Sequence, residues 1–288
     1  MIDLTNPPPS HDRCRGPVKV MRSYIVAAKF DRISGVKRRQ WTREELLQAL
    51  SLYCQIPFGQ MHARNRAIGK LATVINRTPS AIALKLVNFA SLDPELRRRG
   101  VRGMGNVSQV DRDIWEEFYG KWEILADAID VDIIAPDRGS SRKSRFEVRI
   151  PDGPTEGQAF VKSRRGQSFF RSSVMAAYEW KCCLTGIAAP ELLRASHIVP
   201  WSQDVALRLD PHNGLCLNSL HDCAFDRGLI SFTDSCDLLV SKRLKDEVPA
   251  EIYREMFERL RGFSIALPER FSPSYDSLAY HRDKIFLG

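Results

Sequence analysis

Three neighbouring runs indicate how this chain folds: Ala195-Ser-His-Ile-Val-Pro-Trp201, Asp210-Pro-His-Asn-Gly-Leu-Cys-Leu217 and His221-Asp-Cys-Ala-Phe-Asp-Arg-Gly228. It places one histidine on a β-type segment, an asparagine after a loop and a second histidine in a helical run. Leu192 to Val199 is predicted to be a strand, which a proline ends. Asn213-Gly214 is a strong turn signal.

The segment after this turn has helical periodicity. Leu215 to Phe225 is predicted to be a helix, because Leu217, Leu220 and Ala224 fall on one face. His221 lies one step round the helix from Leu220, so we expect its ring to point into the hairpin. His212, in contrast, is expected to be a solvated turn residue.

The order His197, Asn213, His221 resembles the HNH (ββα-metal) nuclease motif, and the wider pattern is most similar to the subfamily found in restriction endonucleases. The similarity covers roughly residues 157–241 and includes the Gly166-Gln-Ser-Phe-Phe-Arg171 lead-in and the run His221-x-x-x-Phe225-Asp226-x-Gly228. Residues 228–232 and 238–240 are predicted to form a second hairpin. The expected fold is α+β, with a helical N-terminal domain and a C-terminal ββα-metal nuclease domain.

The resemblance implies a role for each matching residue. His197 matches the general base, since the ordinary pKa of histidine lies near neutral pH. Asn213 matches the asparagine that orients this base. His221 matches the metal ligand on the helix, with Asp226 as a second ligand. The implied cofactor is a divalent metal ion, Mg²⁺, Mn²⁺, Ni²⁺ or Zn²⁺, that binds the scissile phosphate.

Two features depart from the family pattern. Many members have Asp or His directly before the base, where that residue holds the metal, and here the position is Ser196. Many also carry two CxxC pairs for a structural zinc, but Cys183 and Cys216 each lack the second cysteine. A Cys/His zinc site and a non-catalytic DNA-binding protein on the same scaffold therefore stay open as alternatives.

A basic segment precedes the nuclease motif. From residue 142 to 171 the basic side chains outnumber the acidic ones, and the nonspecific affinity of proteins for DNA comes mostly from such charges. The residues predicted here to contact double-stranded DNA are Arg142, Lys143, Arg164, Arg165 and Arg171.

The part before this segment is predicted to be helical. Thr42 and Thr78 each fit the residue that caps the start of a helix. The apolar segments 68–75 and 79–89 have helix-turn-helix spacing, which is typical of DNA groove recognition. Ser80, Lys85 and Asn88 are expected to face outward, so Lys85 is a candidate DNA contact. The predicted domains are an N-terminal arm 1–38, a helical domain 39–135, a basic linker 136–156 and a nuclease domain 157–288.

Composition agrees with this interpretation. The net charge of +8 and the pI near 9.2 suit a polyanionic partner such as DNA. No apolar run is long enough to span a membrane. Seven cysteines without disulfide-framework spacing, and an N-terminus without the layout of a secretion signal, predict a cytoplasmic protein with reduced thiols. Cutting both strands needs two active sites or one that rearranges, so a homodimer is an open alternative.

Overall fold

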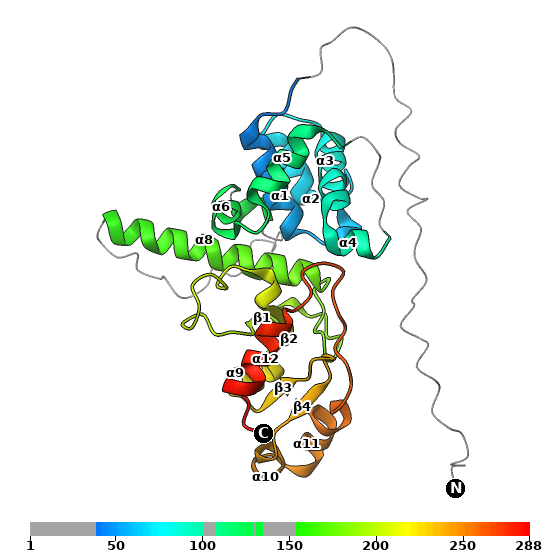
Figure 1. Ribbon diagram of the computed structural model, residues 1–288, viewed down its shortest axis with the longest axis vertical. Helices are drawn as coiled ribbons and strands as arrows, with labels where there is room; N and C mark the ends of the chain where they lie inside the picture. The colour runs from blue at the N-terminus through cyan, green and yellow to red at the C-terminus, as the bar shows by residue number, and fades with distance from the viewer. Residues whose placement is uncertain (1–38, 101–106, 130, 135–153) are drawn as a thin grey trace, which may run out of the picture. The chain divides into compact units, whose positions relative to one another are not determined.

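The computed structural model describes residues 39–100, 107–129, 131–134 and 154–288, and contacts group residues 41–288 into one compact unit (Figure 1). The α-helices are α1 Arg43–Gln55, α2 Arg66–Val74, α3 Pro79–Leu92, α4 Pro94–Arg98, α5 Gln109–Phe118, α6 Trp122–Asp127, α7 Val131–Ile134, α8 Pro154–Ala177, α9 Ser219–Asp226, α10 Arg243–Glu247, α11 Ala250–Met256 and α12 Tyr275–Lys284. The strands are β1 Leu193–His197, β2 Gly214–Asn218, β3 Ile230–Phe232 and β4 Leu238–Val240, and short 3-10 turns lie at Phe58–Gln60, Pro190–Leu192, Pro211–Asn213 and Glu258–Leu260. This mixture of helices and small sheets agrees with the predicted α+β class.

Local capping signals set the first helices of the helical region, residues 41–134. The Thr42 side chain accepts a hydrogen bond from the backbone N–H of Glu45, whose carboxylate accepts one from Thr42 in return, so α1 starts with a capping box. Thr78 caps α3, and Pro79 occupies the first helical position. Both helix starts were predicted from the sequence.

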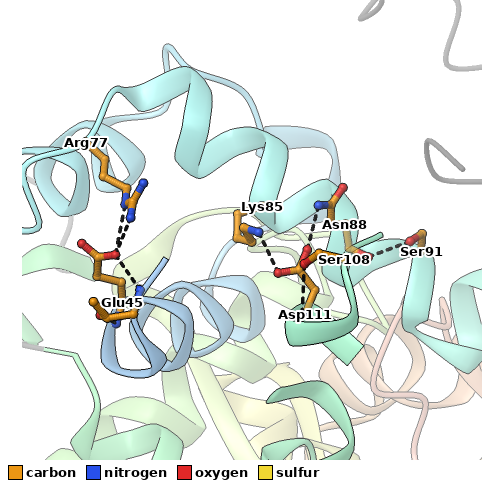
Figure 2. A network of polar contacts seen from close by, with 8 residues as sticks. Glu45, Arg77, Lys85, Asn88, Ser91, Ser108 and Asp111 are labelled. Carbon is orange, nitrogen blue, oxygen red and sulfur yellow. Dashed lines mark hydrogen bonds and ion pairs between the residues drawn. The ribbon is translucent and has the colours of Figure 1, made fainter. Parts of the chain in front are cut away.

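The outward orientation predicted for Lys85 and Asn88 is wrong. Lys85 is buried, and its ammonium nitrogen lies 2.6 Å from Asp111 Oδ1 on α5 (Figure 2). Asn88 donates to the other oxygen of Asp111 at 2.9 Å. Burying a lone ammonium is unfavourable, and Asp111 supplies the counter-charge that makes this position tolerable. Ser80 is exposed, as expected.

The C-terminal segment packs into the helical region. Phe271 contacts the rings of Tyr119 and Trp122 at centroid distances of 6.4 and 5.8 Å. Arg270 is fully buried and donates to the carbonyl oxygens of Tyr53 and Ile56, both at 2.7 Å. These carbonyls lie at the end of α1, where a helix leaves its acceptors without internal partners. One arginine therefore completes a helix more than two hundred positions earlier in the chain.

Two antiparallel hairpins, β1–β2 and β3–β4, flank α9, as the predicted order of hairpin, helix and hairpin requires. The predicted helix at 215–225 starts too early, because Leu215 and Leu217 belong to β2. They pair with Ser196 and Arg194 of β1 and are fully buried. The helix begins only after Asn218, whose side chain caps it.

Helix α8 contacts α1 and α6 of the helical region and both strands of the first hairpin (Figure 1). The predicted linker 136–156 lies almost wholly outside the described residues, so that boundary stays a prediction. Among the described helices none is long and apolar enough to cross a membrane.

Candidate active site

The first hairpin carries the candidate base at the end where the loop 198–213 connects its two strands. His197 is the last residue of β1 and pairs with Gly214, the first residue of β2. A Cβ atom on Gly214 would lie 2.3 Å from Val174 and 3.0 Å from Phe170, both on α8. Glycine at this position therefore lets α8 approach the hairpin, where the Phe170 ring stacks on the His197 imidazole at 3.8 Å.

The hydrogen bond of His197 defines its tautomer. Its Nε2 atom lies 3.0 Å from the carbonyl oxygen of Arg208, which can only accept. In the neutral ring Nε2 therefore carries the proton, and the lone pair is on Nδ1. Burial lowers the pKa of His197, while the Arg208 carbonyl and the charge of Asp222 partly offset this effect. Near neutral pH the imidazole is thus uncharged and able to accept a proton.

Asn213 supports this base through the backbone. Its Oδ1 accepts from the N–H of Val199 at 2.8 Å, and its Nδ2 donates to the carbonyls of Val199 and Leu207 at 3.0 and 3.2 Å. These bonds hold together the two ends of the loop 199–207. Asn213 therefore acts on the His197 ring indirectly, because it fixes the loop that brings the Arg208 carbonyl to His197.

His221 has a packing role in this structure. The residue is fully buried, and its Nδ1 and Nε2 atoms lie 2.8 Å from Asn218 Nδ2 and from the carbonyl oxygen of Met256, respectively. Its ring also packs edge-on against Phe257. Because both nitrogen atoms are engaged, these contacts do not fit the metal-ligand role predicted for His221.

The next residue, Asp222, faces the base instead. Burial raises the pKa of Asp222, and the Ser196 hydroxyl, Arg194, Arg171 and His197 act in the opposite direction. The Asp222 carboxylate therefore lies among these side chains, close enough to His197 for their charges to interact. Sequence reasoning missed it, although its spacing of four residues from Asp226 was a usable signal, since such residues share a helix face.

Asp226 joins Asp222 on that face of α9. Its side chain is exposed, yet partial burial of the carboxyl group and the negative charge of Asp222 raise the pKa of Asp226 to about 6. The Ser196 hydroxyl is buried, and among the described residues it makes no hydrogen bond of good geometry. Two carboxylates that repel each other beside a buried hydroxyl fit the oxygen ligands of a hard divalent cation.

This donor set is small. Within the described residues no three His, Cys, Asp or Glu side chains come together in a group that could hold a metal ion. Mg²⁺ is commonly bound by one or two carboxylates, with waters and substrate phosphates completing its shell. Asp222 and Asp226 match that requirement, whereas the described part of the chain does not support the alternative of a Cys/His zinc site.

Two arginines converge beside the acidic pair. Arg171 on α8 and Arg194 on β1 both donate to the carbonyl oxygen of Leu193, at 3.2 and 3.0 Å. The other predicted DNA contacts are dispersed: Arg164 and Arg165 are exposed on α8, Lys85 is buried in the helical region, and Arg142 and Lys143 lie outside the described residues. Arg194 was not predicted.

A comparison with known families agrees with this geometry. Residues 182–233 match the family model HNH_2, described as HNH endonuclease. The matched segment contains both strands of the first hairpin, all of α9, and therefore His197, Asn213, Asp222 and Asp226. No curated protein matches the chain. The C-terminal region thus carries an HNH endonuclease domain, which indicates nuclease activity.

Proposed function

We propose that this protein is a divalent-metal-dependent endonuclease that hydrolyses phosphodiester bonds in double-stranded DNA, with a role in restriction of foreign or modified DNA. The observation that carries this proposal is the placement of a neutral imidazole, His197, beside the carboxylate pair Asp222 and Asp226 within the matched HNH segment. The restriction role rests only on the subfamily resemblance.

In the proposed mechanism, the lone pair on His197 Nδ1 takes a proton from a water molecule. The resulting hydroxide attacks phosphorus, the bond to the 3′-oxygen breaks, and that oxygen takes up a proton from solvent water. His197 then returns the proton that it accepted to solvent. The products are a 5′-phosphate and a 3′-hydroxyl. The Arg208 carbonyl holds the proton on Nε2, so Nδ1 is the nitrogen that can act as the base. Asn213 keeps the loop that precedes Arg208 in place.

Asp222 and Asp226 would hold the metal ion, and the Ser196 hydroxyl would bind one of its waters. When bound, a divalent cation neutralises charge on the scissile phosphate and on the leaving oxygen. The set predicted from the sequence was His221, Asp226 and Ser196; the proposed set keeps Asp226 and Ser196 and replaces His221 with Asp222, the next residue on α9. Arg171 and Arg194 are placed to bind a backbone phosphate next to the scissile one.

The test is a plasmid cleavage assay with Mg²⁺, Mn²⁺, Ni²⁺ and Zn²⁺, on methylated and unmethylated DNA. We expect cleavage with at least one metal and none in excess chelator. Asp222→Asn and Asp226→Asn should each lower activity and the affinity for Mn²⁺ measured by calorimetry, whereas Asp246→Asn on the distant helix α10 serves as the matched control. Full activity in excess chelator would exclude the metal mechanism.

A specific observation favours a second candidate, a non-catalytic DNA-binding protein. Ser196 stands where many HNH sites have an acidic or imidazole ligand, and the metal would have only two carboxylates in the described residues. The same assay separates the two functions, because the second predicts DNA binding in a gel shift without cleavage under any of the four metals.

A further inference from the structure

His212 lies between two carboxylates that come from distant parts of the chain. Its Nδ1 atom is 2.8 Å from Asp210 Oδ1 in the turn before β2, and its Nε2 atom is 3.3 Å from Glu95 Oε1 on α4. The rings of Trp122 and Phe271 pack around the imidazole at centroid distances of 6.2 and 5.4 Å. The prediction of a solvated turn residue is therefore wrong.

The geometry requires a charged imidazolium. Each ring nitrogen faces a carboxylate oxygen, and both can donate hydrogen bonds only when the ring is protonated. Burial lowers the pKa of His212, but Asp210 and Glu95, the two carboxylates that act on it, outweigh burial and raise the pKa to about 9. Burial raises the pKa of Glu95, but the hydrogen bond and charge of His212, together with the Ser272 N–H and the charge of Arg98, outweigh burial and lower that pKa. The bridge is thus formed across the physiological pH range.

The bridge is anchored on both sides. Glu95 Oε2 also accepts from the N–H of Ser272 at 3.3 Å, and the carbonyl of His212 accepts from the N–H of Ser274 at 2.9 Å. Asp210 Oδ1 accepts from the backbone N–H of His212 at 2.9 Å as well as from its ring. The turn that leads into β2 is therefore held by α4 and by the C-terminal segment together.

This turn leads directly to the base. Asn213 is the residue after His212, and its side chain ties down Val199 and Leu207. Arg208, next along the chain, presents its carbonyl to His197 Nε2. A displacement of His212 would thus reach the base through Asn213 and the Arg208 carbonyl.

We propose that the bridge Glu95–His212–Asp210 is a positioning device through which the helical region holds the general base in its reactive orientation. His212 touches neither substrate nor reacting atoms. The inference rests on the proposed nuclease function, because its effect on rate is read from DNA cleavage.

The kinetic test uses full-length Glu95→Gln and His212→Gln. Each variant should lower kcat by about 10- to 100-fold, the scale seen when a small displacement reaches a reacting group, with the KM for DNA unchanged. Because both variants break one device, the double variant should be no slower than His212→Gln. Glu269→Gln is the matched control, since Glu269 in the C-terminal segment forms an exposed ion pair with Arg99 directly after α4.

The pH profile adds a signature that a merely structural residue would not give. Wild-type kcat should fall as the pH rises through the pKa of His212, because the imidazolium loses the proton that one of its hydrogen bonds requires. In Glu95→Gln a neutral amide replaces one of the two carboxylates, which lowers the pKa of His212. The fall in kcat should therefore begin at lower pH. In His212→Gln it should be absent. An unchanged kcat and an unchanged alkaline limb in Glu95→Gln would overturn the proposal.

A measurement without activity keeps the two proposals distinguishable. Titration of the His212 ring by NMR in the full-length protein should give a pKa well above the ordinary value of 6.5, and a lower one in Glu95→Gln. An ordinary value in the wild type would mean that the bridge does not form in solution, whatever the cleavage assay shows. If the bridge is present but no metal supports cleavage, the proposed nuclease function fails, and with it the positioning role.

Discussion

The helical region and helix α9 both place charged side chains close together. The helical region pairs opposite charges, whereas α9 brings two negative charges together. In the helical region, Lys85 faces Asp111 and Arg77 faces Glu45, each at 2.6 Å (Figure 2). The Trp41 ring lies beneath both cations, at 4.0 Å from the Arg77 guanidinium and 4.9 Å from the Lys85 ammonium. On α9, beside the first hairpin, the carboxylates of Asp222 and Asp226 share one face, and the pKa of each is raised.

The pairs of opposite charge in the helical region neutralise each other, whereas the two carboxylates on α9 form an arrangement that a bound cation would relieve. A buried pair of opposite charges satisfies both partners, and removing one leaves the other stranded. A pair of like charges is unfavourable until a cation or a proton relieves it. The first arrangement should therefore respond to mutation in stability, and the second in activity.

The largest effect is expected at the base. His197→Ala should lower the cleavage rate by about 10²–10⁴-fold, the usual contribution of a general base, and should leave DNA affinity in a gel shift unchanged. Cleavage by the wild type should decline as the pH falls through the pKa of His197, which lies below 6.5, because the protonated ring cannot accept a proton. His62→Ala, in the helical region, is the control. A near-normal rate in His197→Ala would show that another group is the base.

The next effect concerns stability. Lys85→Ala leaves the fully buried Asp111 carboxylate without its cation and should lower the free energy of unfolding by about 3–5 kcal/mol, measured by chemical denaturation. Arg43→Ala, which breaks an exposed pair with Glu117, should cost less than about 1 kcal/mol. By contrast, Asp222→Asn should not destabilise the protein, because it removes a repulsion. A large loss of stability in Asp222→Asn would contradict the distinction between the two regions.

The smallest effect is expected at the arginine pair. Arg194→Ala should weaken DNA binding by a few-fold and reduce the slope of log affinity against log salt by about 1, the change expected when one phosphate contact is lost. Binding is best measured in the His197→Ala background, where the DNA stays intact. Arg243→Ala on α10 should leave the slope as it is. Equal slopes for Arg194→Ala and its parent would place the phosphate contact elsewhere.

The sequence predicts elements well where the signal is local. Thr42 and Thr78 identify the starts of α1 and α3 because a capping side chain bonds to backbone within three residues. The strand carrying His197 and the second hairpin were also predicted, since alternation and turn residues are local signals.

Prediction was weaker where a distant segment decides which side of a helix is buried. His221 and Asp222 are neighbours, and Met256 and Phe257 determine that the histidine is the one that points inward. Lys85 is buried for the same kind of reason, because Asp111 arrives from another helix. A helical repeat defines faces only to within about one residue, and that uncertainty is enough to confuse the buried His221 with Asp222, the neighbour that we propose as the ligand.

Arg270 has a consequence for the order in which the chain folds during synthesis. It donates to the last carbonyls of α1, but it is synthesised only after the whole matched segment 182–233. While the ribosome is still making the nuclease hairpins, α1 lacks this partner and the ring of Phe271 is missing from its place beside Trp122. The helical region thus reaches its final packing only after the residues of the candidate active site have been made. A nascent chain that carries His197 but not yet Arg270 would be incompletely folded, so the proposed nuclease activity should appear only after Arg270 and Phe271 have been made and packed.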